Sequence, residues 1–162
     1  METTYYDTPD GALSAARMTL RRRMENGMSV CTVKTPAGAH GRGEWELECG
    51  SITDAISELC KLGAPREMAQ LCAAGVQPVC GAKFTRQACV IAGEGFTAEL
   101  ALDRGVLTGG GKEIPLCEVE LELKAGDADA MVAFAAQFAG RFGLAEEKKS
   151  KFRRAMDLAR EG

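Results

Sequence analysis

Apolar and polar residues alternate over several stretches of the chain, which is the period of a β-strand with one buried face. The clearest stretch is 115–124, PLCEVELELK, in which aliphatic residues alternate with three glutamates. These glutamates are Glu118, Glu120 and Glu122. Because successive side chains of a strand point to opposite faces, three like charges are predicted in a row on one face.

The other predicted strands also combine an apolar face with a face that carries charge. The basic positions come mainly early in the chain, and the acidic row comes late. The in-phase charged residues are Arg21 and Arg23; Lys34; Arg42, Glu44, Glu46 and Glu48; Arg86; and Glu99 and Asp103. The pattern places Glu99 and Asp103 on the charged face but assigns them no specific role.

The strands are interrupted by segments with helical periodicity and by turn signals. Asn26-Gly27 and 93–95 (GEG) each predict a hairpin, since these residues tolerate positive φ. Helices are expected at 51–63, 65–74, from Asp127 to about 140 or 143, and at 146–160. Hairpin connections between strand-rich segments predict an α+β fold with an antiparallel sheet.

Two explanations of the charged faces remain open at this point. An open antiparallel sheet can simply expose its polar face to water. Alternatively, the sheet closes into a barrel with the charges inside, and the helices cover the apolar outer face. Segregation of basic and acidic residues on different strands favours the barrel. Charges in an enclosed interior need counter-charges, and a polyphosphate with Mg²⁺ or Mn²⁺ would satisfy both the arginines and the glutamates.

Composition narrows the class of protein. The 162 residues fit one domain, and a net charge of −3 gives no indication of nucleic-acid binding. No apolar run approaches the length of a membrane span, so no membrane partner is expected. Seven cysteines without a CxxC pair predict reduced thiols in a cytoplasmic protein, rather than disulfides or a zinc site.

Several short motifs, taken in order, resemble the CYTH family, also called the triphosphate tunnel metalloenzymes. They are YYDTPDGAL, MTLRRR, CTVK, RGEWEL, AELALDRG, CEVELEL and SKFRRA. The resemblance covers almost the whole chain and implies an antiparallel β-barrel, the triphosphate tunnel, flanked by helices. It also implies binding of inorganic, nucleoside or thiamine triphosphate.

The resemblance further implies roles for individual residues. The expected phosphate-binding residues are Arg21, Arg23, Lys34, Arg42, Arg86, Lys151 and Arg154, and the expected metal ligands are Glu44, Glu118, Glu120 and Glu122. Bound Mg²⁺ or Mn²⁺ would activate a water for attack on the terminal phosphorus, and the arginines would stabilise the transferring group. No protein nucleophile is required.

The sequence departs from the family pattern at its N-terminus, where the ExExK strand and the first helix are missing. A single CYTH-like domain over residues 1–162 is therefore expected to be N-terminally incomplete and one strand short. Because a barrel that lacks a strand has two open edges, a homodimer or a donated strand is a candidate partner. A metal-dependent triphosphatase is the leading hypothesis. The alternatives are a non-catalytic polyphosphate- or nucleotide-binding module and an adenylate cyclase.

Overall fold

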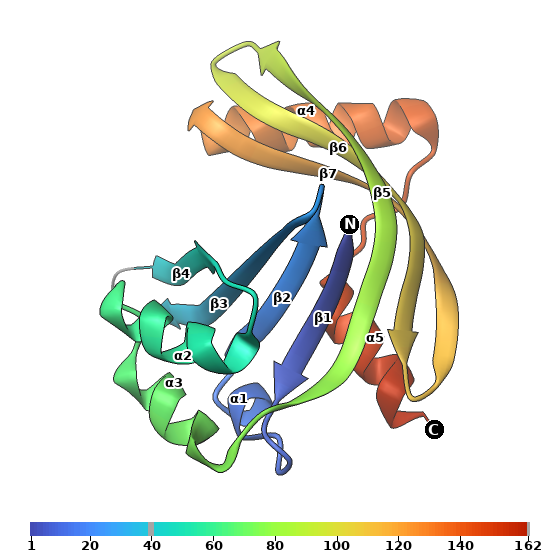
Figure 1. The fold of residues 1–162 in the computed structure, drawn as a ribbon. Helices are drawn as coiled ribbons and strands as arrows, with labels where there is room; N and C mark the ends of the chain where they lie inside the picture. Colours follow the sequence, from blue (N-terminus) through green and yellow to red (C-terminus); the bar gives the residue numbers. More distant parts are fainter. Residues whose placement is uncertain (39–40, 162) are drawn as a thin grey trace.

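A curled antiparallel sheet forms the frame of the protein, as seen in a computed structural model that describes residues 1–38 and 41–161 (Figure 1). The strands are β1 (Glu2–Asp7), β2 (Thr19–Glu25), β3 (Met28–Gly38), β4 (Gly41–Glu48), β5 (Gln77–Gly93), β6 (Phe96–Gly109) and β7 (Lys112–Gly126). The helices are α1 (Ala12–Ala15), α2 (Ile52–Lys61), α3 (Arg66–Leu71) with the 3₁₀ turn η1 (Cys72–Ala74), α4 (Ala128–Phe142) and α5 (Lys151–Arg160). The predicted α+β class is confirmed.

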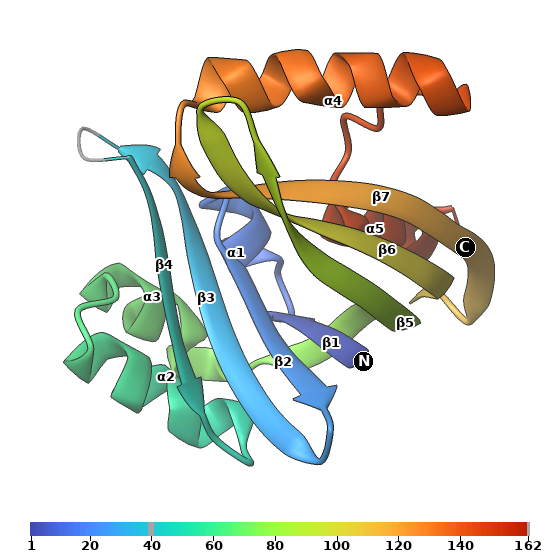
Figure 2. The same ribbon diagram turned by 90° about the horizontal axis from the view of Figure 1, so that it is seen from above.

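The strand order is β4-β3-β2-β1-β5-β6-β7, so β4 and β7 are the two edges of the sheet. Seen from above, the sheet curls until these two edges lie on either side of an opening (Figure 2). The described residues therefore form a half-barrel, in agreement with the expectation of a barrel that is one strand short. Its concave face carries the charged residues of the alternating strands.

Both predicted hairpins are present. Asn26 and Gly27, with φ of 50° and 81°, join β2 to β3. Positive φ at both central residues matches the right-handed twist of the flanking strands. Glu94 and Gly95 connect β5 to β6, and in this turn the positive φ is at Gly95 (83°) and not at Glu94.

The convex face of β1–β4 is covered by α2 and α3. Leu20, Cys31 and Val33 are fully buried in this core, where they pack with Leu59 of α2 and Met68 of α3. These apolar positions have the opposite phase to Arg21 and Arg23. Packing on the convex side therefore turns the two arginines toward the concave side.

Leu20→Ala is expected to lower the free energy of unfolding by about 2–5 kcal/mol, because it deletes a fully buried side chain from this core. Urea denaturation measures the change. Leu62→Ala, at the end of α2 and 56% exposed, is the matched control and should change the free energy by less than about 0.5 kcal/mol. Equal losses in both variants would contradict this assignment of the core.

On the concave side, α5 packs against β5, β6 and β1. Ala155 is buried with Phe84 and Leu116, and the ring of Phe152 stacks 5.1 Å from that of Tyr5. This packing brings the first turn of α5 beside the charged residues of β5–β7. In Figure 1, α5 lies within the curl of the sheet.

The C-terminal helix is shorter than the sequence predicted. Gly143, in the left-handed conformation, ends α4, and residues 144–150 are not helical. Ser150 begins α5 by accepting a hydrogen bond from the backbone N–H of Arg153, so the helix starts at Lys151 rather than at 146. The correction places Lys151 at the start of the helix, where its side chain reaches the sheet.

No helix in the described part of the chain has the length and apolar character that crossing a bilayer requires.

Candidate phosphate and metal site

Three carboxylates meet on the concave face where β6 and β7 pair. Asp103 lies opposite Glu118 in the register of these strands, and Glu120 lies opposite Ala101. One oxygen from each of Asp103, Glu118 and Glu120 lies within 4.8 Å of the others. Hard oxygen donors at this spacing fit Mg²⁺ or Mn²⁺.

Asp103 is the most buried member of this acidic cluster, with a side chain that is 0% exposed. Its carboxylate accepts two hydrogen bonds of 2.7 Å from Arg86, directly across the β5–β6 pair, and lies 2.8 Å from Lys151 Nζ. Burial alone would raise the pKa of Asp103. The hydrogen bonds from Arg86 and Lys151 outweigh it, so the pKa lies below its ordinary value.

The first turn of α5 supplies two cations to the same cluster. Lys151 Nζ donates hydrogen bonds to Glu118 and, at 2.6 Å, to Glu120, while Arg154 pairs with Glu118. Burial acts to lower the pKa of Lys151, but hydrogen bonds to the three carboxylates raise it above the ordinary value. Lys151 therefore stays charged within the cluster.

The opposite wall of the concave face is basic. Among the described residues, the Nε atom of Arg21 is buried without a hydrogen-bond partner, and Arg23 Nε donates to Thr3 Oγ1 at 3.3 Å. Neither arginine forms an ion pair with a carboxylate in the described part of the chain. Burial and the neighbouring charge of Arg21 lower the pKa of Arg23. Two guanidinium groups on one face of β2 have the charge and the hydrogen-bond donors that suit an anion.

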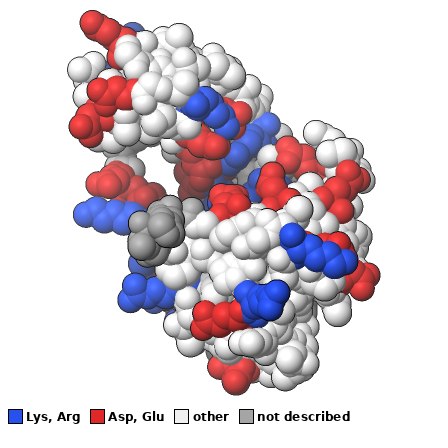
Figure 3. All heavy atoms as spheres, turned by 90° about the vertical axis from the view of Figure 1, so that its left-hand side faces the viewer, with Lys and Arg blue, Asp and Glu red and all other residues white. Residues whose placement is uncertain are grey.

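Tyr5 lies between the two walls. Burial raises the pKa of its hydroxyl, while the charges of Arg21, Arg23 and Lys151 act in the opposite direction. Because Tyr5 lies opposite Arg21 in the β1–β2 register and its ring stacks on that of Phe152 in α5, the basic wall and the first turn of α5 lie on the same side of the sheet. Figure 3 views the molecule from the side of β4 and shows a hollow between the α4 lobe and the α2 lobe, with both acidic and basic side chains around it.

Two further metal ligands predicted from the sequence, Glu44 and Glu122, lie on the concave face but outside the cluster. Glu44 forms an ion pair with Lys34 at 3.0 Å, and Glu122 pairs with Lys124 at 3.1 Å with 65% of its side chain exposed. The backbone of Arg42 lies in β4, but its side chain lies outside the described part of the structure. Of the four predicted metal ligands, Glu118 and Glu120 therefore lie in the acidic cluster, and Glu44 and Glu122 lie outside it.

Asp103 belongs to the acidic cluster, although the sequence analysis assigned it no role. Its phase in AELALDRG already placed it on the charged face. The missing information was the register, since only the pairing of β5, β6 and β7 shows that Arg86, Asp103 and Glu118 lie in one row.

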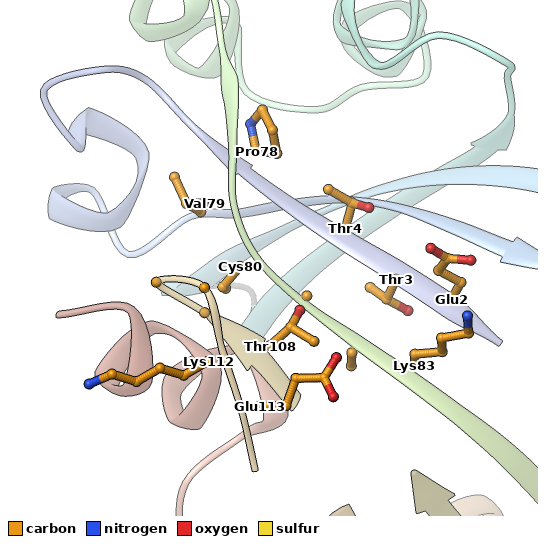
Figure 4. Close-up of a pocket in the computed structure, with 15 residues that line it drawn as sticks. Glu2, Thr3, Thr4, Pro78, Val79, Cys80, Lys83, Thr108, Lys112 and Glu113 are labelled. Carbon is orange, nitrogen blue, oxygen red and sulfur yellow. The ribbon is translucent and has the colours of Figure 1, made fainter. Parts of the chain in front are cut away.

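A separate groove of about 580 Å³ lies on the outer, convex side of the sheet, between β1, β5 and the β6–β7 hairpin (Figure 4). Thr4, Gly81, Lys83, Thr108 and Glu113 line it. These residues have the opposite phase to Arg86 and Asp103, so the sheet separates this groove from the charged site. Its mixed and sparse charges do not form a comparable cluster.

The cysteines take no part in the charged site. All seven are free thiols, and burial raises the pKa of Cys80 to about 12 and those of Cys31 and Cys72 to about 11. Thiols that remain protonated near neutral pH are poor nucleophiles and poor metal ligands.

A half-barrel whose concave face opposes arginines to a carboxylate cluster is the architecture of a triphosphate tunnel. Residues 1–156 match the CYTH domain, and the chain belongs to this family.

One curated relative is an inorganic triphosphatase from Haemophilus influenzae, which is 31% identical over 135 residues. The match covers 81% of this chain but only 38% of the relative, so the chain spans less than half of that protein.

Two solved structures share the fold, each at 19% sequence identity. One is a Bacillus halodurans protein proposed to be an adenylate cyclase, with a TM-score of 0.58 over 92% of this chain and 77% of that one. The other is HpAC1 from Hippeastrum, proposed to be an adenylyl cyclase and described as having a dominant triphosphatase activity. Its TM-score is 0.60, over 99% of this chain and 81% of that one.

Proposed function

We propose that the protein is a metal-dependent hydrolase of triphosphate-containing substrates, with inorganic triphosphate as the simplest of them. The observation that carries the proposal is the pair of arginines on β2, Arg21 and Arg23, which have no carboxylate partner among the described residues and lie on the same concave face as the cluster of Asp103, Glu118 and Glu120. A linear triphosphate would supply a counter-charge to the two arginines, and its divalent cation would take oxygen ligands from the carboxylates, which pair with Arg86, Lys151 and Arg154 in this structure. The family and the triphosphatase relative support the same assignment.

In this proposal the two walls have separate tasks. Arg21 and Arg23 bind phosphate oxygens through charge-assisted hydrogen bonds and hold the chain of phosphates in one orientation. Their fixed positive charge also stabilises the negative charge that develops on the transferring phosphoryl group. Because the arginine side chains are partly buried, water screens this interaction less than it would on an open surface.

Asp103, Glu118 and Glu120 are the residues that would hold the divalent cation, since they offer a compact set of oxygen donors. When bound, Mg²⁺ or Mn²⁺ would neutralise phosphate charge and lower the pKa of a water molecule that attacks the terminal phosphorus. Arg86 keeps Asp103 in position through its paired hydrogen bonds. No nucleophilic side chain is needed.

Phosphate release from inorganic triphosphate tests this function directly. We expect the purified protein to release phosphate in the presence of Mg²⁺ or Mn²⁺, and to stop when EDTA removes the metal. The same assay with ATP, followed by separation of the products, reports any formation of cyclic AMP and pyrophosphate.

The outcomes separate the candidate functions. Binding of triphosphate without release of phosphate would identify a non-catalytic polyphosphate-binding module. Cyclic AMP formed from ATP would identify a cyclase. Absence of both release and binding, in a protein shown to be folded by circular dichroism, would contradict the proposal.

A further inference from the structure

The acidic cluster is already neutralised by cations of the protein itself. The three carboxylates Asp103, Glu118 and Glu120 are paired with Arg86, Lys151 and Arg154. Lys151 is central to this arrangement, because its single ammonium group contacts all three carboxylates. It therefore lies at the point toward which all of the candidate metal ligands converge.

We propose that Lys151 is a built-in counter-ion that leaves the acidic cluster when a metal–triphosphate complex enters. The carboxylates then bind the divalent cation, and the ammonium group of Lys151 binds the phosphate oxygens. The proposal rests on the proposed function and goes beyond it, because it states that the protein binds metal and triphosphate cooperatively rather than as independent ligands.

The charges around Lys151 explain this coupling. Without triphosphate, a divalent cation must displace the ammonium group toward Arg21 and Arg23, which carry the same charge and repel it. With triphosphate bound against those arginines, the displaced ammonium group gains phosphate oxygens as partners. Each ligand therefore lowers the cost of binding the other, and linkage makes the effect reciprocal.

The geometry favours exchange at Lys151 over exchange at Arg86. Arg86 is held to Asp103 by two parallel hydrogen bonds, an arrangement that fixes the planar guanidinium group. Lys151 is a point charge on a flexible four-carbon stem. The backbone of α5 is anchored by the buried Ala155 and Leu158, so only the side chain has to move.

Binding measurements on Lys151→Met test the exchange. Methionine keeps the length of the side chain and removes its charge. We expect Mn²⁺ alone, monitored by the electron paramagnetic resonance signal of free Mn²⁺, to bind about 10-fold more tightly to this variant than to the unaltered protein. The preformed Mn²⁺–triphosphate complex, titrated by calorimetry, is expected to bind about 10-fold more weakly.

These opposite changes distinguish exchange from a purely structural role, which would weaken both ligands together. Lys149→Met is the matched control and should leave both affinities unchanged, because Lys149 is 60% exposed and pairs with Asp157 instead. If Lys151→Met fails to fold, Lys151→Gln provides the same comparison with a polar side chain.

Unchanged or weaker binding of Mn²⁺ to the Lys151 variants would overturn the exchange. This failure is distinguishable from failure of the proposed function, which would appear as no binding of the Mn²⁺–triphosphate complex to the unaltered protein.

Discussion

Replacing Arg21 or Arg23 with alanine is expected to weaken the binding of inorganic triphosphate by about 10- to 100-fold. Each arginine faces the concave side without a carboxylate partner among the described residues, so its charge is available to phosphate oxygens. A hydrogen bond to a charged group contributes about 1.5–3 kcal/mol, which corresponds to this range of affinity. Calorimetric titration with triphosphate in the presence of Mg²⁺ measures the loss.

Arg22, which lies between Arg21 and Arg23 in the sequence of β2, provides the control. Its guanidinium group lies on the opposite face of β2, where it donates to Ser29 Oγ at 2.9 Å and contacts Met24 Sδ. Arg22→Ala should therefore leave the affinity for triphosphate within about 2-fold, a change of less than 0.5 kcal/mol that is typical of substitutions away from a site. An equal loss in all three variants would indicate a general electrostatic effect rather than a site on the concave face.

Asp103→Asn is expected to reduce the free energy of unfolding by about 3 kcal/mol at neutral pH, because removing one partner of a buried ion pair leaves the other without its counter-charge. We expect the low end of the usual range, since Lys151 keeps Glu118 and Glu120 as partners. Urea denaturation measures this loss. The same variant should also lose phosphate release, since it lacks one of the proposed metal ligands.

The difference in stability between the unaltered protein and Asp103→Asn should depend on pH. The pKa of Asp103 is lowered in the folded protein. Its carboxylate therefore stabilises the fold above the unfolded pKa of about 3.9, and this contribution disappears as the pH falls through the folded pKa. The two unfolding free energies should converge below about pH 4.

Glu122→Gln is the control for the aspartate variant. Its side chain is largely exposed and pairs with the exposed Lys124, so the free energy of unfolding should change by less than about 0.5 kcal/mol. A loss of stability at Glu122 comparable to that at Asp103 would contradict the assignment of Asp103 as the buried centre of the acidic cluster.

Alternation along the chain predicted which residues share a face, and this information was sufficient for much of the fold. The positions of Arg21, Arg23 and Glu120 on the concave face follow from a period of two residues, because Leu20 beside Arg21, and Val119 and Leu121 beside Glu120, have the opposite phase. The turns at Asn26-Gly27 and Glu94-Gly95 were equally predictable, because their backbone conformations depend on local residues.

The composition of the acidic cluster was less predictable, because it depends on register as well as phase. Glu44 and Glu122 have the correct phase, but their strand positions place them beside Lys34 and Lys124. Asp103 was left without a role because a single aspartate near the end of an alternating stretch has no local pattern that marks it. Its importance appears only when β5, β6 and β7 pair.

Lys151 illustrates a similar limit in the terminal helix. The charges around it are typical of a solvated helix face, whereas the family resemblance alone implied a role in phosphate binding. Packing of Phe152 and Ala155 on the concave side turns the first residue of α5 into the sheet, and Lys151 becomes 8% exposed. The long-range contact between α5 and β7 is therefore the information that the sequence pattern lacks.

A crystal structure of the protein with inorganic triphosphate and Mn²⁺, located by its anomalous scattering, is the most direct measurement. Phosphate oxygens bonded to Arg21 and Arg23, with Mn²⁺ held by Asp103 and Glu120, are the expected result. Triphosphate or Mn²⁺ found only on the convex face, and bound to none of the arginines and carboxylates of the concave face, would contradict the account.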